Sequence, residues 1–284
     1  MLIRALALAG LISATGVVVH TAAPAAAQAE TAAISIAELM QATALDEVFT
    51  QFGASIETSP QEQGVPFDAM LSAVWVEAAR EVFNADSMHA ALEAALDGRF
   101  TPEDEAVLAG FFHSGFGREI TALERAVQKL DPGEQLAART EGLSLVAAME
   151  EGSSRDRQID EMLTLVNAEI AGAMVGQSVR GMLIGLSVAR QRGDIEVPWE
   201  EIELQLAQIL PDIQADVAAT QRAMMAYAYR DLAEADLDRY LEFLRTEAAQ
   251  KLYALASYSI GRIVTDSMTT FGQRLATKLG RVNV

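Results

Sequence analysis

Apolar residues return at every third or fourth position along most of the chain after residue 35, which is the spacing of one face of an α-helix. Between residues 69 and 83, Met70, Val74 and Ala78 form such a stripe, with Trp75 beside it. Residues that favour helices, above all alanine, leucine and glutamate, dominate this part of the chain. Alternating patterns typical of strands are scarce, and Ile195-Glu196-Val197 is too short to count. The sequence therefore predicts an all-α fold.

Clusters of turn-forming residues interrupt the helical pattern and divide the chain into roughly eight to ten predicted helices. These clusters are Thr58-Ser59-Pro60 through Pro66, Asp97-Gly98, Asp131-Pro132-Gly133, Gly152-Ser153-Ser154, Arg192-Gly193-Asp194 and Pro198. Asp86 is a further predicted N-cap, at the start of a helix over residues 87–96.

The segment FTPEDEAVLAGFFHSGFGRE, residues 100–119, contains a clear helix start. Thr101 is placed to be the N-cap, Pro102 suits the first helical position, and three acidic residues follow at the positive end of the helix dipole. The predicted buried face consists of Val107, Leu108, Phe111 and Phe112. The pattern pauses at residues 113–115 and resumes with Ile120, which indicates a joint between two helices.

At this joint His113 stands directly beside Ser114, which poses a choice between catalysis and capping. A catalytic pair needs the imidazole within reach of the serine oxygen and an acid on its other nitrogen. Adjacent residues at a helix end point in different directions, and the chain has no G-x-S-x-G motif. We therefore expect Ser114 to be an N-cap that accepts a hydrogen bond from the backbone N–H of Phe116 or Gly117.

The same arrangement recurs 132 residues later, in EADLDRYLEFLRTEAAQKLYALA, residues 234–256. Phe111 then corresponds to Phe243, Ser114 to Thr246 and Gly117 to Ala249, while identical residues pair at Asp104/Asp236, Ala122/Ala254 and Leu123/Leu255. The matched hydroxyl and small residues predict two degenerate copies of one helical module, residues 30–151 and 155–284, with a seam at residues 152–154. Small residues at 117 and 249 would let the two helices of each joint approach closely.

The motif around Phe111, Phe112, Ser114 and Gly117 resembles that of the family catalogued as domain of unknown function 2059, roughly Phe-Tyr-x-Ser-x-x-Gly. Phe112 departs from the pattern, because tyrosine is usual there. The resemblance covers residues 37–130 well and the second half only through Phe243, Thr246 and Ala249. It implies an exported bacterial helical protein, and it implies no particular activity.

The N-terminus has the organisation of a signal peptide. Arg4 is the only charged residue among the first 29, an apolar stretch runs from Ala5 to Val19, and Ala27-Gln28-Ala29 places small residues where signal peptidase needs them. We predict a signal peptide over residues 1–29, cleavage between Ala29 and Glu30, and a periplasmic destination. The alternative, an uncleaved anchor, requires roughly 20 apolar residues, and this stretch is shorter. No later stretch predicts a membrane span.

Charge and cysteine content narrow the possible functions. A formal net charge of −19 repels phosphate backbones and anionic lipids, so nucleic acid is not an expected partner. This negative charge is explained either by solubility or, more specifically, by the binding of cations or basic partners. With no cysteine, neither disulfides nor thiol chemistry are available. The chain also lacks a Gly-rich phosphate loop, and no cofactor is predicted.

Two groups of residues could bind a metal ion, and each has a simpler interpretation. Asp86, His89 and Glu93 share one helical face, but the paired metal motifs are missing, and His89 fits a solvent-exposed face. Glu200, Glu201 and Glu203 could attract a cation, although acidic residues are in any case favoured in a first helical turn.

Two apolar features suggest contact surfaces. Gly172, Gly176, Gly181 and Gly185 recur at a spacing that lets helices approach closely, either inside the fold or in a homodimer. Met224 and Met225, with Tyr227 and Tyr229, could form an adaptable surface, although a core position is the stronger interpretation.

These observations favour a non-enzymatic periplasmic helical protein that binds a protein, peptide or apolar ligand in the cell envelope. The alternative is a hydrolase that uses carboxylates alone, with a site between the two modules. Raised carboxyl pKa values in one shared cleft would favour the hydrolase.

Overall fold

The computed structural model describes residues 34–62, 69–166 and 199–282, together with residues 176, 178, 180 and 181. The predicted signal peptide, the cleavage site between Ala29 and Glu30, and the turn cluster at 192–198 lie outside these residues.

The predicted all-α fold is confirmed, with about ten helices where roughly eight to ten were expected, and the described residues contain no strand. The helices are α2 (Ile36–Ala42), α3 (Val48–Glu62), α4 (Ala69–Val82), α5 (Ala85–Leu96), α6 (Pro102–Phe112), α7 (Gly115–Gln128), α8 (Pro132–Ala148), α9 (Ser154–Leu165), α11 (Trp199–Ala228), α12 (Glu234–Leu244) and α13 (Glu247–Val282). None of them is both long and apolar enough to cross a bilayer over the part of the chain described.

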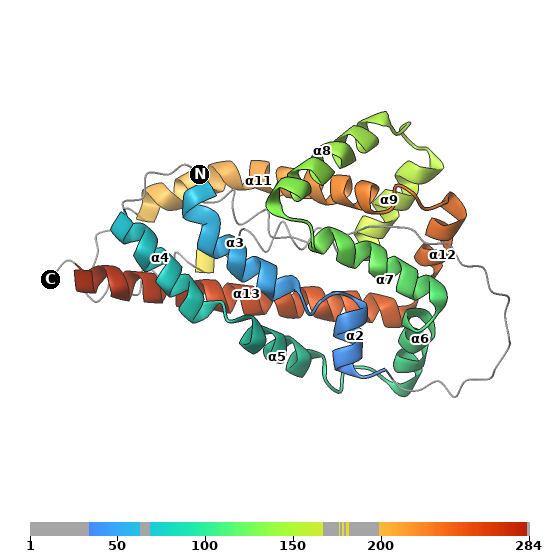
Figure 1. Ribbon diagram of the computed structural model, residues 1–284, viewed down its shortest axis with the longest axis horizontal. Coiled ribbons are helices and arrows are strands. Elements are labelled where there is room, and N and C mark those ends of the chain that lie inside the picture. The colour runs from blue at the N-terminus through green and yellow to red at the C-terminus, as the bar shows by residue number, and fades with distance from the viewer. Residues whose placement is uncertain are drawn as a thin grey trace.

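The two longest helices, α11 and α13, run along the long axis of the molecule (Figure 1). α13 packs beside α4, α5 and α6, whereas α11 packs against α8 and α9. Helices from the first predicted module therefore pack directly on helices from the second. Their apolar side chains form one continuous core, in which Trp75 and Phe83 both contact the ring of Phe271.

Side-chain caps fix several of the helix starts. Capping boxes are present at Ser35, Thr101 and Asp131. In each box the side chain of the cap accepts a hydrogen bond from the backbone N–H of the third helical residue, and the side chain of that residue accepts one from the backbone N–H of the cap. Ser153 caps α9. Each box satisfies two backbone donors that the first turn would otherwise leave unpaired.

Two local predictions were wrong. Asn84, not Asp86, caps α5, which begins two residues earlier than expected. Val107 is 42% exposed, and Ala109, at 1%, takes its place on the buried face of α6 because that helix turns Leu108 and Phe112 inward. The predicted break over residues 58–66 does separate α3 from α4, but α3 continues through Pro60 and ends only at Glu62.

The continuation of α3 through Pro60 has a physical reason in the tertiary structure. Proline has no N–H to donate to the carbonyl four residues earlier, which here belongs to Ile56. The indole N–H of Trp75, on α4, donates to that carbonyl at 2.7 Å. A side chain from the neighbouring helix thus supplies a hydrogen bond that the proline cannot make.

Candidate functional site

Ser114 forms the joint between α6 and α7. It is the N-cap of α7, and its hydroxyl accepts a hydrogen bond from the backbone N–H of Gly117 at 2.8 Å. The His113 backbone N–H donates to Ala109 and ends α6. The serine oxygen is therefore committed to the helix start, as the capping interpretation predicts, and is not directed at the neighbouring imidazole.

Gly117 allows the two helices of the joint to fold back on each other. A Cβ atom at this position would overlap the backbone carbonyl of Phe111. Gly117 is buried, so no free space is available for a displaced methyl group. A small residue at this position is a steric requirement of the turn.

The second copy of the motif has the same capping hydrogen bond, with Ala249 in place of Gly117. Thr246 accepts from the backbone N–H of Ala249 at 3.2 Å and also donates to the carbonyl of Phe243 at 2.7 Å. α12 begins and ends 132 residues after α6, and α13 begins 132 residues after α7. One difference is that Ala233, at the N-cap of α12, offers no side-chain hydrogen bond, whereas Thr101 does so for α6. The duplication itself stays a prediction.

The two motif copies contact each other directly. The rings of Phe111 and Phe243 stack at 3.6 Å between centroids with only 4° between their planes. Phe112 meets Phe243 edge-on at 5.4 Å, and Tyr240 stacks on Phe111 at 5.8 Å. Residues that correspond in the sequence thus meet in the core, where their aromatic surface joins the two halves of the chain.

An open cavity of about 540 Å³ lies beside the joint, between α2 and α7. Its lining residues are Ile34, Glu38, Gln41, Ala42, Asp46, His113 and Arg125. The volume falls within the range of small-molecule sites, and the cavity brings together both acidic and basic side chains.

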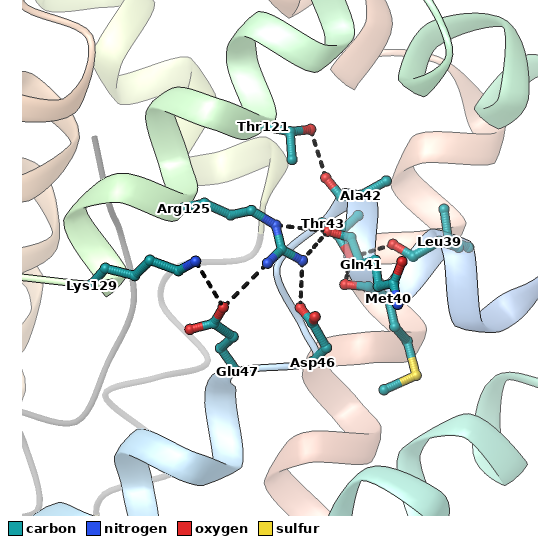
Figure 2. A network of polar contacts seen from close by, with 10 residues as sticks. All are labelled: Leu39, Met40, Gln41, Ala42, Thr43, Asp46, Glu47, Thr121, Arg125 and Lys129. Carbon is teal, nitrogen blue, oxygen red and sulfur yellow. Dashed lines mark hydrogen bonds and ion pairs between the residues drawn. The ribbon is translucent and has the colours of Figure 1, made fainter. Parts of the chain in front are cut away.

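Arg125, on α7, is the centre of the polar contacts along this cavity (Figure 2). Its guanidinium donates to the backbone carbonyl of Gln41, forms an ion pair with Asp46 at 2.7 Å and contacts Glu47 at 3.2 Å. Thr121, one turn earlier, donates to the carbonyl of Ala42 at 2.7 Å. α7 therefore binds the last two carbonyls of α2, of which that of Gln41 also accepts from the backbone N–H of Ala44.

The remaining ionisable groups of the cavity are Glu38 and His113. Glu38 accepts hydrogen bonds from the backbone N–H and the hydroxyl of Ser35. The backbone hydrogen bond, more than the nearby His113, lowers the pKa of the Glu38 carboxyl. This carboxylate stays ionised and is held at the start of α2, so it suits structural capping better than proton transfer.

A second cluster lies on the other side of α7, where Glu124 meets three tyrosines. The hydroxyls of Tyr229 and Tyr240 donate to the same carboxylate oxygen of Glu124 at 2.5 and 2.9 Å. The hydroxyl of Tyr253 lies 3.3 Å from that of Tyr240. Burial raises the pKa of the Glu124 carboxyl, although the two tyrosine hydrogen bonds act in the opposite direction.

In the Glu124 cluster the carboxyl of Glu124 is the candidate proton donor, and no group is a suitable general base. Burial and the Glu124 charge raise the pKa of all three tyrosine hydroxyls, so they remain neutral and act as hydrogen-bond donors. The carboxyls of Glu38, Asp104 and Glu161 have lowered pKa values. Glycoside hydrolases that rely on carboxyl groups use two of them, in different protonation states, on either side of the substrate. Glu124 has no second carboxyl among its hydrogen-bond partners.

The candidate metal ligands Asp86, His89 and Glu93 differ in how far their side chains are buried. His89 is half-buried against the ring of Phe49, at 5.3 Å between centroids, rather than on a solvent-exposed face as expected. Asp86 and Glu93 are exposed, and the described residues hold no group of three or more ligands. Glu200, Glu201 and Glu203 lie at the start of α11, but their side chains are outside the described set.

The core interpretation of the methionine and tyrosine cluster is confirmed. Met224, Met225 and Tyr229 are buried, and Tyr227 packs its ring under the guanidinium of Arg230 at 4.0 Å. The alternative interpretation, an adaptable exposed surface, was wrong.

Two of the four spaced glycines are described, and both pack inside the chain. A Cβ atom on Gly176 would lie 3.1 Å from Leu210 of α11, and one on Gly181 would lie 2.9 Å from the Thr265 carbonyl of α13. Gly172 and Gly185 are outside the described residues, and a homodimer through this segment stays a prediction.

The sequence analysis missed Arg125, Glu124 and Gly142. Gly142, in the middle of α8, lies against α11 so closely that a Cβ atom would overlap the carbonyl of Ala223. A glycine inside an otherwise helical pattern is a recognisable signal of close packing. No such signal exists for Arg125 and Glu124, because their partners come from distant parts of the chain.

No protein-family model matches the chain, and no curated protein or solved structure matches it either. The resemblance carried by Phe111, Ser114 and Gly117 therefore stays a prediction from the sequence.

Proposed function

We propose that the chain is a non-enzymatic helical protein of the bacterial periplasm that acts by binding a protein partner in the cell envelope. The proposed location rests on the signal-peptide pattern of residues 1–29. The motif resemblance to an exported bacterial family points the same way.

The observation that carries the non-enzymatic proposal is the bonding of the charged groups around the cavity. Arg125 holds the end of α2 and the turn that follows it, while Glu38 holds the start of α2. Ser114 holds the start of α7. Each of these groups already has a structural task, and a catalytic group must instead be free to exchange protons or bonds with a substrate.

The alternative function is a hydrolase in which Glu124 is the general acid. Its raised pKa favours this alternative, because a protonated carboxyl can donate to a leaving group. The two tyrosine hydroxyls that already bind this carboxyl weigh against it.

Cross-linking in living cells, followed by purification of the tagged full chain and mass spectrometry, tests the proposal. We expect one partner protein in near-stoichiometric amount. A panel of ester, glycoside and phosphate-ester substrates tests the alternative in parallel. Turnover that disappears in Glu124→Gln, with no partner recovered, would overturn the proposal in favour of the hydrolase.

A further inference from the structure

The outward face of α8 is exposed, apolar and free of charge. Leu136 and Leu143, seven residues apart and so on one side of the helix, are 64% and 42% exposed. Gly133, Ala137 and Ala147 are exposed on the same outward side. Among the described helices, α8 packs almost entirely on α11, and this face lies opposite that contact (Figure 1).

The two hydroxyl residues on this face turn their polar atoms to the helix itself. Thr140 donates to the carbonyl of Leu136 at 2.8 Å, and Ser144 donates to the carbonyl of Thr140 at 3.0 Å. With their donors satisfied inside the helix, these side chains can meet an apolar surface without losing a hydrogen bond to water. Small residues beside the two leucines also allow another helix to approach closely.

Acidic residues border the face along one edge and beyond one end. Glu134 and Glu141 lie along the edge, and Glu150 and Glu151 follow the C-terminus of α8. The single basic residue of α8, Arg139, is paired with Asp216 at 2.7 Å, and Arg230 lies 3.6 Å from Glu141. Glu134, which also accepts a hydrogen bond from the Asp131 N–H, and the exposed Glu150 and Glu151 keep the surroundings of this apolar face acidic, in a chain whose net charge is −19.

We infer that the outward face of α8 is a docking surface for an amphipathic helix of another protein, with an apolar seam and flanking lysines or arginines. The seam covers Leu136 and Leu143, and the basic flanks pair with the acidic edge. This inference names the chemistry of the partner that the proposed function requires, and it rests on that function.

A second copy of the chain fits this surface poorly. In an antiparallel pairing of two α8 helices, like edges meet, so Glu134 and Glu141 would face the same residues of the other copy. In a parallel pairing, Glu150 and Glu151 of the two copies would meet. Both arrangements bring like charges together, whereas a basic helix replaces this repulsion with attraction.

The probe is a synthetic, fluorescein-labelled helical peptide of about five turns, which matches the length of α8. It carries leucines at a seven-residue spacing and lysines on both flanks. A control peptide keeps the leucines and replaces every lysine with glutamate. Fluorescence anisotropy of each peptide is titrated with the full chain.

We expect the basic peptide to bind about tenfold more tightly than the acidic one, and added salt to weaken its binding. The double variant Leu136→Asp/Leu143→Asp should lose about tenfold in affinity. Leu204→Asp is the matched control, because Leu204 is 61% exposed on α11, and it should bind as the unaltered chain does. Since all three leucines are exposed, circular dichroism should show the same helix content in every variant.

Four outcomes overturn the inference. Equal affinity for the acidic peptide removes the charge argument, and unchanged binding by the double variant removes the surface. A dimer that dissociates only in the double variant assigns this face to a second copy. A partner that cross-links in cells to the double variant as well as to the unaltered chain would leave the proposed function standing and remove only this inference.

Discussion

The absence of a Cβ atom at particular glycines determines how closely the helices of this protein approach. At Gly117 and Gly142 an added Cβ would overlap a backbone carbonyl of a neighbouring helix, whereas at Gly110 and Gly115 it would meet no atom within 4 Å. Glycines of the same chain therefore have opposite structural roles. The fold depends on the first pair, while the second pair only lowers helix propensity.

Replacement of Ser114 tests the capping of α7. Ser114→Ala should lower the free energy of unfolding by about 0.5–2 kcal/mol, because the Gly117 N–H loses its acceptor. Ser114→Asp should restore most of this loss, because a carboxylate also caps and favours the positive helix end. Urea unfolding of the three proteins measures the ranking, and Thr246 should follow it. Equal midpoints for Ser114 and its alanine variant would contradict the capping role.

Replacement of Gly117 tests the close approach at the same joint. Gly117→Ala should destabilise the protein by about 1–3 kcal/mol, because the new methyl group overlaps the Phe111 carbonyl. Gly115→Ala, two residues away on the same helix, should leave the midpoint unchanged or raise it slightly. Thermal or urea unfolding compares the two variants directly. If both variants have the same stability, the joint does not require a glycine at 117.

At the scale of elements, helix ends here are completed by side chains from other helices. α2 ends at Ala42 and is followed by Ala44 in the left-handed region at φ 55°, and Arg125 and Thr121 from α7 bind its last carbonyls. α3 passes through Pro60 because Trp75 binds the carbonyl of Ile56. Such contacts make each helix depend on its neighbours, since an isolated short helix has only marginal stability.

The packing of α8 on α11 gives a prediction at this scale. Gly142→Ala should destabilise the protein by about 1–3 kcal/mol, because the methyl group forces α8 away from the Ala223 carbonyl. Gly110→Ala on the exposed side of α6 should be neutral or stabilising by up to about 1 kcal/mol. Chemical unfolding measures both. Loss of the basic-peptide binding in Gly142→Ala, with helix content retained, would further show that α8 must be seated on α11 to present its outward face.

At the scale of the whole molecule, specific aromatic and polar contacts join the two halves of the chain in addition to the packing of their helices. Phe111 stacks on Phe243, Asp104 pairs with Lys251 at 2.6 Å, and Glu124 accepts hydrogen bonds from Tyr229 and Tyr240. In each case a residue from the first half meets one from the second. Both aromatic and polar contacts therefore connect the two halves within the single continuous core.

The Glu124 cluster predicts an unusual dependence of stability on pH. Because its folded pKa is raised, the stability that this carboxyl contributes is complete below its ordinary pKa of 4.5 and is lost as pH rises through the raised value. Glu124→Gln keeps a hydrogen-bond acceptor but cannot ionise. It should therefore become more stable relative to the unaltered chain as pH increases above about 4.5.

Unfolding by urea at a series of pH values gives the difference between the two proteins. This comparison removes the contribution of the other carboxyls, such as Asp104, whose pKa the salt bridge to Lys251 lowers and which acts with the opposite sign. A constant difference across pH would mean that Glu124 titrates normally in the folded protein.

The sequence by itself determined the local structure of this protein. Helix class, the starts at Thr101 and Asp131, and the cap at Ser114 depend on residues within a few positions of one another. Backbone donors at a helix start are satisfied by side chains only one turn away, so a short stretch of sequence contains the whole interaction. The prediction of Asp86 as the cap of α5 was wrong by two residues, because Asn84 has that position.

Only the tertiary structure decided which residues meet across the fold. The pairs Arg125 with Gln41, Glu124 with Tyr229, and Gly142 with Ala223 are each separated by about 80 to 105 positions. The apolar spacing of a helix states which face is buried, but not against which other helix, because burial of apolar surface has no direction. For the same reason the exposed face of α8 could not be distinguished from a core face until α11 was seen to cover the opposite side.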